Sequence, residues 1–185
     1  MLKIAVFGFY GPDQARTPPD RPTHLSPVTT EEFMRIVWEM EPPESRIGDA
    51  ADALGFVKLT TVTKRPVYVQ ALSDRMAHAA GQLDCDGYIA IIDAVKILAP
   101  KMIQAALRRL DELHPTADLI IAAGRQNEPD ALSSEEIRAI LGLNAALLVM
   151  PYVPGEPKTV HRLIRRMVRY IDNPDRVPPP VFPEK

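Results

Sequence analysis

The sequence of 185 residues has a single cysteine, no long apolar run and almost no net charge. Cys85 cannot form a disulfide within the chain, and a lone cysteine is most often a small core residue rather than a nucleophile. Because no run of about 18 apolar residues and no signal-peptide pattern occurs, we expect a cytoplasmic protein without membrane insertion. The net charge of −2 gives no reason to expect nucleic acid or an anionic membrane as a partner.

The residue types that carry catalysis are present, but without the spacing that catalysis needs. The four histidines have neither metal-ligand spacing nor a matching cysteine pair, so we expect no metal site. No Ser/His/Asp or Cys/His set stands out either. Asp93 ends a predicted strand at the sheet edge where ligands usually bind, although capping the turn into Ala94 is the favoured role. We therefore predict no catalytic residue.

Proline, by contrast, is abundant: 19 residues, about twice the average share. The prolines gather in segments 12–27, 42–43 and 178–183, which are predicted loops and a tail. Loops above about 12–15 residues are usually functional or disordered, so residues 9–28 form either a mobile loop or one that binds a partner or covers a pocket. We expect disorder after Asn173, which divides the chain into a domain over 1–173 and a proline-rich tail over 174–185.

Short apolar runs predict strands, and apolar residues at helical spacing predict helices. The predicted strands cover residues 2–8, 56–63, 67–71, 88–92, 119–123 and 147–150, and the predicted helices cover 30–40, 72–83, 100–110, 133–141 and 160–171. A hairpin at Lys64-Arg65-Pro66 implies one antiparallel edge strand. We therefore predict an α/β fold, in which helices cover both faces of a mostly parallel six-stranded sheet.

The turn after the first strand lacks a phosphate-binding loop. Such a loop reads Gly-x-x-x-x-Gly-Lys-Ser/Thr, in which the lysine meets the outer phosphates and the hydroxyl holds magnesium. Counting from Gly8, the second glycine position holds Asp13 and the lysine position holds Gln14. If the loop is longer, so that the helix starts at Thr29 or Thr30, a threonine takes the place of the lysine. Neither alignment supplies the cation.

Three stretches carry a resemblance to a known family. They are Phe33-Met34-Arg35, Asp86-Gly87-Tyr88-Ile89-Ala90-Ile91-Ile92-Asp93, and Gln126-Asn127-Glu128-Pro129-Asp130-Ala131-Leu132-Ser133-Ser134-Glu135-Glu136-Ile137. Together with the element order, they resemble the Ras-like small GTPases, and within them the bacterial branch related to the gliding-motility polarity switch. The resemblance covers nearly the whole chain, is firmest over residues 86–171, and implies a Ras-like three-layer sandwich.

The motifs with which that family binds nucleotide are altered throughout this sequence. The second switch of the family reads Asp-x-x-Gly-Gln, and the aligned residues here are Gln70-Ala71-Leu72-Ser73-Asp74. The guanine-reading motif Asn-Lys-x-Asp is replaced by Gly124-Arg125-Gln126-Asn127, and the Ser-Ala loop is replaced near Tyr152-Val153-Pro154. The resemblance thus implies a vestigial nucleotide pocket at Gly8, Gly11, Thr29, Thr30, Ser45, Gly124, Arg125 and Asn127.

The resemblance and the altered motifs together predict a pseudo-GTPase. This would be a non-catalytic interaction or scaffold subunit of a bacterial complex that needs no cofactor, with another protein, suggested by the resemblance to be of the roadblock type, as its partner. We expect the interface over residues 44–83, including Val57, Leu59, Thr61, Thr63, Asp74 and Met76. The alternative is an active or weakly active GTPase that binds GTP or GDP with magnesium, in which Arg16, Arg21 or Arg125 replaces the lost lysine.

The last predicted helix has one strongly basic face. His161, Arg162, Arg165, Arg166 and Arg169 all fall on it. A solvated face is the favoured interpretation, and an acidic protein partner is the alternative.

Overall fold

The computed structural model describes residues 2–9, 30–40, 56–60, 65–72, 84–173 and 175–183. Its strands form one six-stranded sheet in the order β2-β3-β1-β4-β5-β6. Their bounds are Leu2–Phe9 for β1, Phe56–Thr60 for β2, Pro66–Ala71 for β3, Gly87–Asp93 for β4, Asp118–Gly124 for β5 and Leu148–Tyr152 for β6. Only the β2–β3 pair is antiparallel; the other four pairs are parallel. The predicted sheet, with its antiparallel edge strand, is confirmed.

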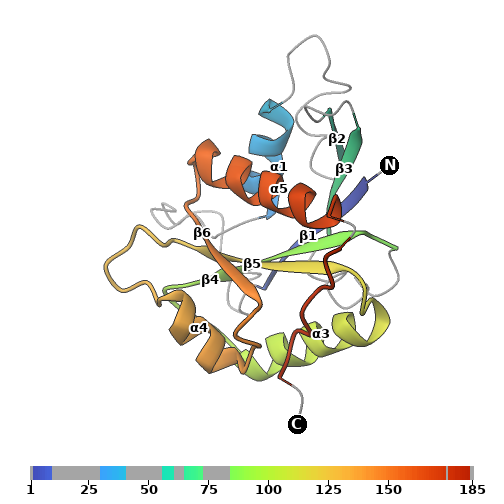
Figure 1. The fold of residues 1–185 in the computed structure, drawn as a ribbon. Coiled ribbons are helices and arrows are strands. Elements are labelled where there is room, and N and C mark those ends of the chain that lie inside the picture. The colour runs from blue at the N-terminus through green and yellow to red at the C-terminus, as the bar shows by residue number, and fades with distance from the viewer. Residues whose placement is uncertain are drawn as a thin grey trace.

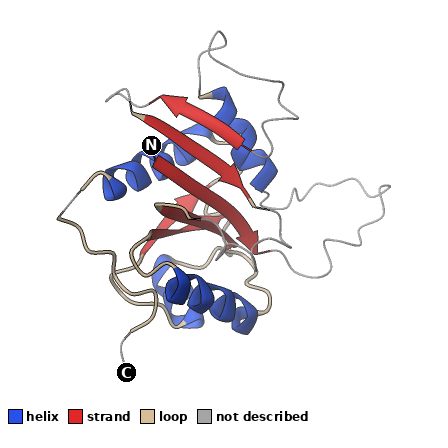
Figure 2. Ribbon diagram, turned by 90° about the vertical axis from the view of Figure 1, so that its right-hand side faces the viewer, coloured by secondary structure: helices blue, strands red, loops and turns tan. Residues whose placement is uncertain are grey.

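Helices cover both faces of this sheet, as Figures 1 and 2 show. Helices α1 (Thr30–Glu39) and α5 (Pro157–Ile171) lie on one face, and α3 (Pro100–Leu113) and α4 (Ser134–Leu141) lie on the other. The predicted helix over 72–83 lies outside the described residues except for Leu72. None of the helices in the described part of the chain is long and apolar enough to cross a membrane.

The ends of α4 follow from local sequence chemistry. Ser133 Oγ accepts a hydrogen bond from the Glu136 amide at 3.2 Å, and Glu136 Oε2 accepts one from the Ser133 amide at 2.8 Å. This reciprocal pair is a capping box, and it satisfies backbone donors that the first turn leaves open. Gly142 ends the helix at a φ of 60°, a left-handed conformation in which glycine carries no Cβ penalty.

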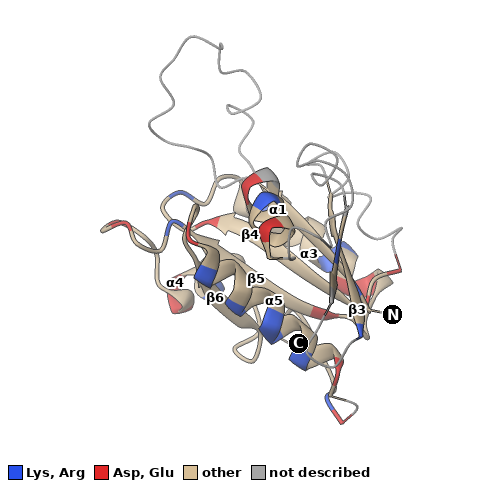
Figure 3. Cartoon of the chain, turned by 90° about the horizontal axis from the view of Figure 1, so that it is seen from above, with Lys and Arg blue, Asp and Glu red and all other residues tan. Residues whose placement is uncertain are grey.

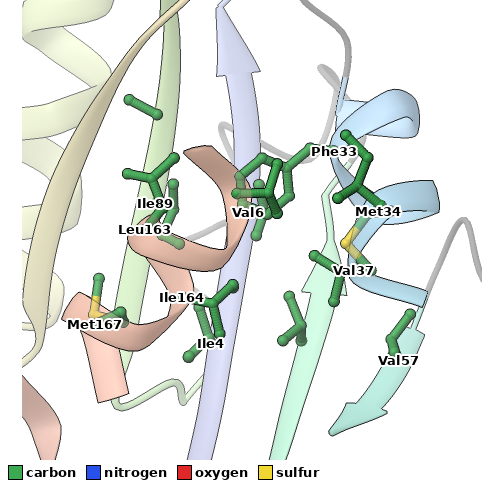
Figure 4. Close-up of a cluster of buried hydrophobic side chains, with 14 of the residues drawn as sticks. Ile4, Val6, Phe33, Met34, Val37, Val57, Ile89, Leu163, Ile164 and Met167 are labelled. Carbon is green, nitrogen blue, oxygen red and sulfur yellow. The ribbon is translucent and has the colours of Figure 1, made fainter. Parts of the chain in front are cut away.

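The central strand β1 supplies side chains to two separate hydrophobic clusters. Ile4 and Val6 belong to the cluster under α1 and α5, which Figure 4 shows in close-up. Ala5 and Phe7 belong to the cluster on the other face, with residues of α3 and α4. Successive side chains of a strand point to opposite faces, so this division follows from the predicted strand over residues 2–8.

The expectation of disorder after Asn173 is wrong for residues 175–183, which pack against the domain. Arg176 Nε donates to Asp118 Oδ1 at 2.8 Å, and the guanidinium of Arg176 lies 3.5 Å from the ring centroid of Tyr170. Val181 is buried, and its carbonyl accepts a hydrogen bond from the Asn144 amide at 2.9 Å. A proline-rich composition therefore accompanies an ordered strap here, because Arg176 and Val181 each contact the domain.

Candidate functional site

The carboxyl ends of the parallel strands meet at one edge of the sheet, where ligands of open α/β folds usually bind. Phe9 at the end of β1 pairs with Ile92, and Asp93 at the end of β4 pairs with Gly124. The structure thereby brings Gly8, Gly124 and the following turn with Arg125 and Asn127 to a common edge. Thr30 is buried at the start of α1, while Gly11, Thr29 and Ser45 lie outside the described residues.

Strand β1 does not turn at Gly8. It continues to Phe9, whose ring packs edge-on against Phe7 with centroids 5.5 Å apart. A phosphate-binding loop needs glycines so that its backbone amides can point inward at the ligand. In this chain the residue after Gly8 is instead a bulky aromatic still paired in the sheet.

A three-residue charge cluster, made of Arg125, Glu128 and Asp93, occupies the turn after β5. Arg125, with a φ of 63°, donates from Nε and Nη2 to the two carboxylate oxygens of Glu128, each at 2.6 Å. Its Nη1 donates to Asp93 Oδ2 at 3.1 Å. The Arg125 side chain is 17% exposed, so the guanidinium is largely enclosed by its two carboxylate partners.

The pKa values of Arg125 and Glu128 shift in the direction that keeps both groups charged. The hydrogen bonds with Glu128 raise the pKa of Arg125, and the same contact lowers the pKa of Glu128. Because one cation faces two carboxylates, the cluster is net negative. It would repel a polyphosphate rather than attract it.

Replacement of Glu128 by glutamine should lower the melting temperature slightly at pH 7, and this effect should shrink as the pH falls below about 4.3. The folded pKa of Glu128 is lowered, so its stabilising effect is present above the ordinary glutamate pKa of about 4.3 and is lost as the pH falls through the lowered value. Thermal unfolding of both proteins from pH 3 to 7 measures this. The control is Glu135→Gln, because Glu135 is 82% exposed and its ion pair with Arg138 is long, at 3.5 Å. A wild-type advantage that persists unchanged at pH 3 would contradict the assignment.

Side chains of the neighbouring turns satisfy their own backbone. Asp93 Oδ1 accepts from the Val95 amide at 2.9 Å, which is the capping role favoured from the sequence. Gln126 Nε2 donates to the Leu132 carbonyl at 2.7 Å. After β6, Thr159 Oγ1 accepts from the Val153 amide at 3.3 Å and donates to the Glu156 carbonyl at 2.8 Å. These polar groups are thus engaged within the chain itself.

Two of the six residues expected at the partner interface lie in the part of the chain that the structure describes. Val57 and Leu59 are buried in the cluster that α1 covers. The face of β2 that the sequence analysis assigned to a partner is therefore covered by the chain's own helix. Thr61, Thr63, Asp74 and Met76 lie outside the described residues.

The sequence analysis did not single out Glu128, although its spacing from Arg125 was a usable signal. Residues three apart in a turn or helix are neighbours, and opposite charges at that spacing often pair. Reading Arg125 as a replacement for the lost lysine overlooked this local partner. Arg125 is consequently paired with a carboxylate of its own turn.

Cys85 has the character of a structural residue. It packs against the cluster on the α3 and α4 face, and burial raises its pKa to about 11. The thiolate, which is the nucleophilic form, is therefore scarce at neutral pH. Among the described residues, no three His, Cys, Asp or Glu side chains gather in a way that could hold a metal ion.

Comparison with known proteins establishes the fold. The cytosolic domain of the T. maritima FeoB iron transporter, in its GMPPNP form, matches with a TM-score of 0.55 and 14% sequence identity, over 97% of this chain and 67% of that chain. At this identity the likeness concerns the fold alone, and the fold is GTPase-like. No family model matches the sequence, and no curated protein matches it.

Proposed function

We propose that this GTPase-like domain is a non-catalytic protein-binding subunit that does not use nucleotide. The observation that carries the proposal is the closed cluster of Arg125, Glu128 and Asp93. It lies at the turn that reads guanine in the family this sequence resembles. The cation there is neutralised by two carboxylates, and Asn127 offers an amide in place of the carboxylate that accepts two hydrogen bonds from guanine.

The energetic argument rests on charge-assisted hydrogen bonds, each of which contributes about 1.5–3 kcal/mol. The phosphate-loop lysine, the magnesium-side groups and the base-reading aspartate are all replaced in this sequence. Since about 1.4 kcal/mol corresponds to a factor of ten in affinity, several such losses weaken nucleotide binding by many orders of magnitude. We accordingly propose that the domain needs no cofactor.

The proposed partner is another protein, and the family resemblance suggests one of the roadblock type. Strand β2 is the last strand on its side of the sheet. An edge strand can accept an added strand through its backbone even when its side chains are covered. Within the described part of the interface expected over residues 44–83, the backbone edge of β2 is where we propose that a partner adds.

A second candidate function is a weakly active GTPase, and one observation favours it. The FeoB cytosolic domain that shares this fold was solved in a GMPPNP form. Under this candidate Arg125 would have to leave Glu128 and Asp93 in order to meet a phosphate.

Calorimetry with GTP, GDP and ATP in the presence of magnesium tests the proposal. We expect no saturable binding, and a dissociation constant below about 1 μM for any of the three would contradict it. The variant Arg125→Met separates the two candidates, because it should remove any binding that depends on this side chain. Capture of a partner protein is expected to be the same with and without added nucleotide.

A further inference from the structure

A basic groove runs beside α5 on the face of the sheet that this helix covers. Its volume is about 600 Å³. The side chains that line it are those of Leu148, Met150, Lys158, His161, Arg162, Arg165, Arg166 and Arg169. Figure 3 shows the Lys and Arg positions spaced along α5. Of the residues that the structure describes, no acidic one lines the groove.

Among the described residues, the cations of the groove differ from most of the other arginines in making no ion pair with a carboxylate. Elsewhere among the described residues, ion pairs hold Arg35, Arg65, Arg109, Arg125, Arg138 and Arg176. Within the same described residues, Lys158, Arg162, Arg165 and Arg169 make no ion pair, and Arg166 lies 4.9 Å from the ring centroid of Tyr170. Helix α5 contains no aspartate or glutamate, so no partner is available along the helix.

Strand β6 supplies an apolar element to the same groove. Leu148 and Met150 alternate along β6 and so project to the same face of the sheet. Both are partly exposed and pack at the border of the cluster under α5. The groove therefore joins a row of positive charge to an apolar strip, and this combination suits an occupant with carboxylates beside apolar side chains.

The backbone edge of β6 is closed to strand addition. The Val149 carbonyl accepts from Ser134 Oγ at 3.5 Å, and the Leu147 carbonyl accepts from Arg138 Nε at 3.1 Å. Pro151, also in β6, has no N–H to donate. Proline on an edge strand is a common protection against edge pairing. An occupant of the groove is thus held by side chains rather than by a ladder of backbone hydrogen bonds.

We infer that this groove binds an acidic segment of a partner protein. Lys158, Arg162, Arg165 and Arg169 span 11 helical positions, which is about 16 Å, and an extended peptide of about five residues covers that length. The positive charges of the groove favour acidic residues in the bound segment. Leu148 and Met150 favour apolar residues between those acidic residues. A phosphate backbone has no apolar groups at that position, and the chain's net charge of −2 is not that of a nucleic-acid-binding protein.

The test uses the full chain and a fluorescein-labelled ten-residue peptide in which Glu alternates with Leu. Its control peptide has Gln at every Glu position. Fluorescence anisotropy at low salt should show saturable binding of the Glu peptide, at least about tenfold tighter than the Gln peptide, and weakening as salt rises. No saturable binding, or equal binding of the two peptides, would overturn the inference.

Two matched double variants locate the binding site. Arg162→Glu with Arg165→Glu reverses two groove charges and should weaken the Glu peptide at least about tenfold. Lys101→Glu with Arg109→Glu makes the same charge change on exposed positions of α3 and should change the affinity less than about twofold. Circular dichroism checks that both variants are folded. Equal weakening by the two pairs would show a general charge effect and would refute the groove.

Two competitors test whether the groove binds a different polyanion instead of an acidic peptide. A 20-base-pair DNA duplex and phosphatidylserine vesicles, tested at the same salt concentration, should compete poorly with the peptide. Tighter binding of either one, abolished by the groove variants, would assign the site to that polyanion instead. The inference rests on the proposed function only in taking the partner to be a protein. If the protein binds both nucleotide and the Glu peptide, the proposed function is refuted and the groove inference stands. If it binds neither nucleotide nor the peptide, the groove inference is refuted and the proposed function stands.

Discussion

Replacement of Ile4 by alanine should lower the free energy of unfolding by about 2–5 kcal/mol. Ile4 is fully buried in the middle of β1, between Val69 of β3 and Gly87 of β4 in the sheet register. Both neighbouring strands hold their backbone positions, so the site cannot collapse easily around the smaller side chain. The loss then includes both the missing hydrophobic contacts and the cavity left behind.

Urea unfolding of the two proteins measures this difference, with the slope used to check that the unfolded states are comparable. The control is Val177→Ala, because Val177 is 85% exposed and a substitution there should stay within about 0.5 kcal/mol. An unchanged midpoint for Ile4→Ala would mean that β1 is not a buried central strand.

Replacement of Gly87 by valine should destabilise the fold by about 3 kcal/mol, the upper end for a small-to-large change in a packed core. A Cβ at Gly87 would overlap with Met167 Sδ and would lie 3.0 Å from Ile171 Cδ1. Met167 is fully buried in α5, so its side chain can give way only by repacking within the core. The added methyl groups would therefore displace the Met167 side chain or move α5 away from β4.

A compensating substitution distinguishes this steric mechanism from a loss of backbone freedom. Met167→Ala removes the atom that a new Cβ would meet, so the double variant Gly87→Ala with Met167→Ala should be more stable than the sum of the two single changes predicts. Denaturant unfolding of the four proteins completes the cycle. Strict additivity would show that Gly87 and Met167 do not meet.

Local patterns were sufficient to predict most of the fold. The apolar alternation of β1 assigned Ile4 and Val6 to one face and Ala5 and Phe7 to the other, and the two clusters confirm it. The hairpin around Arg65 fixed the antiparallel edge pair, and the spacing of Ser133 and Glu136 fixed the start of α4. These features depend on residues that are close in the sequence, or on a strand period that any sheet imposes.

Contacts between residues that are far apart in the sequence could not be predicted from local patterns. The strap at 175–183 is held by Asp118 and Asn144, and no local pattern pairs Arg176 with an aspartate 58 positions earlier. The burial of Val57 and Leu59 required knowledge of where α1 lies. At the candidate site, the geometry of the bonds from Arg125 to Glu128 and Asp93 could not be predicted from the sequence. They depend on the left-handed turn that places the Arg125 side chain.

Because β1 is a central strand, it must wait during synthesis for a neighbour that comes much later in the chain. Strand β1 leaves the ribosome first, yet one of its two neighbours, β4, begins with Gly87, which pairs with Ile4 from 83 positions earlier. At about 5–20 residues per second, that neighbour follows about 4–17 s later. During this interval β1 has at least one unpaired edge and an apolar surface without its final cover. The slower the translation, the longer this edge and this apolar surface stay exposed, and such surfaces are prone to aggregation.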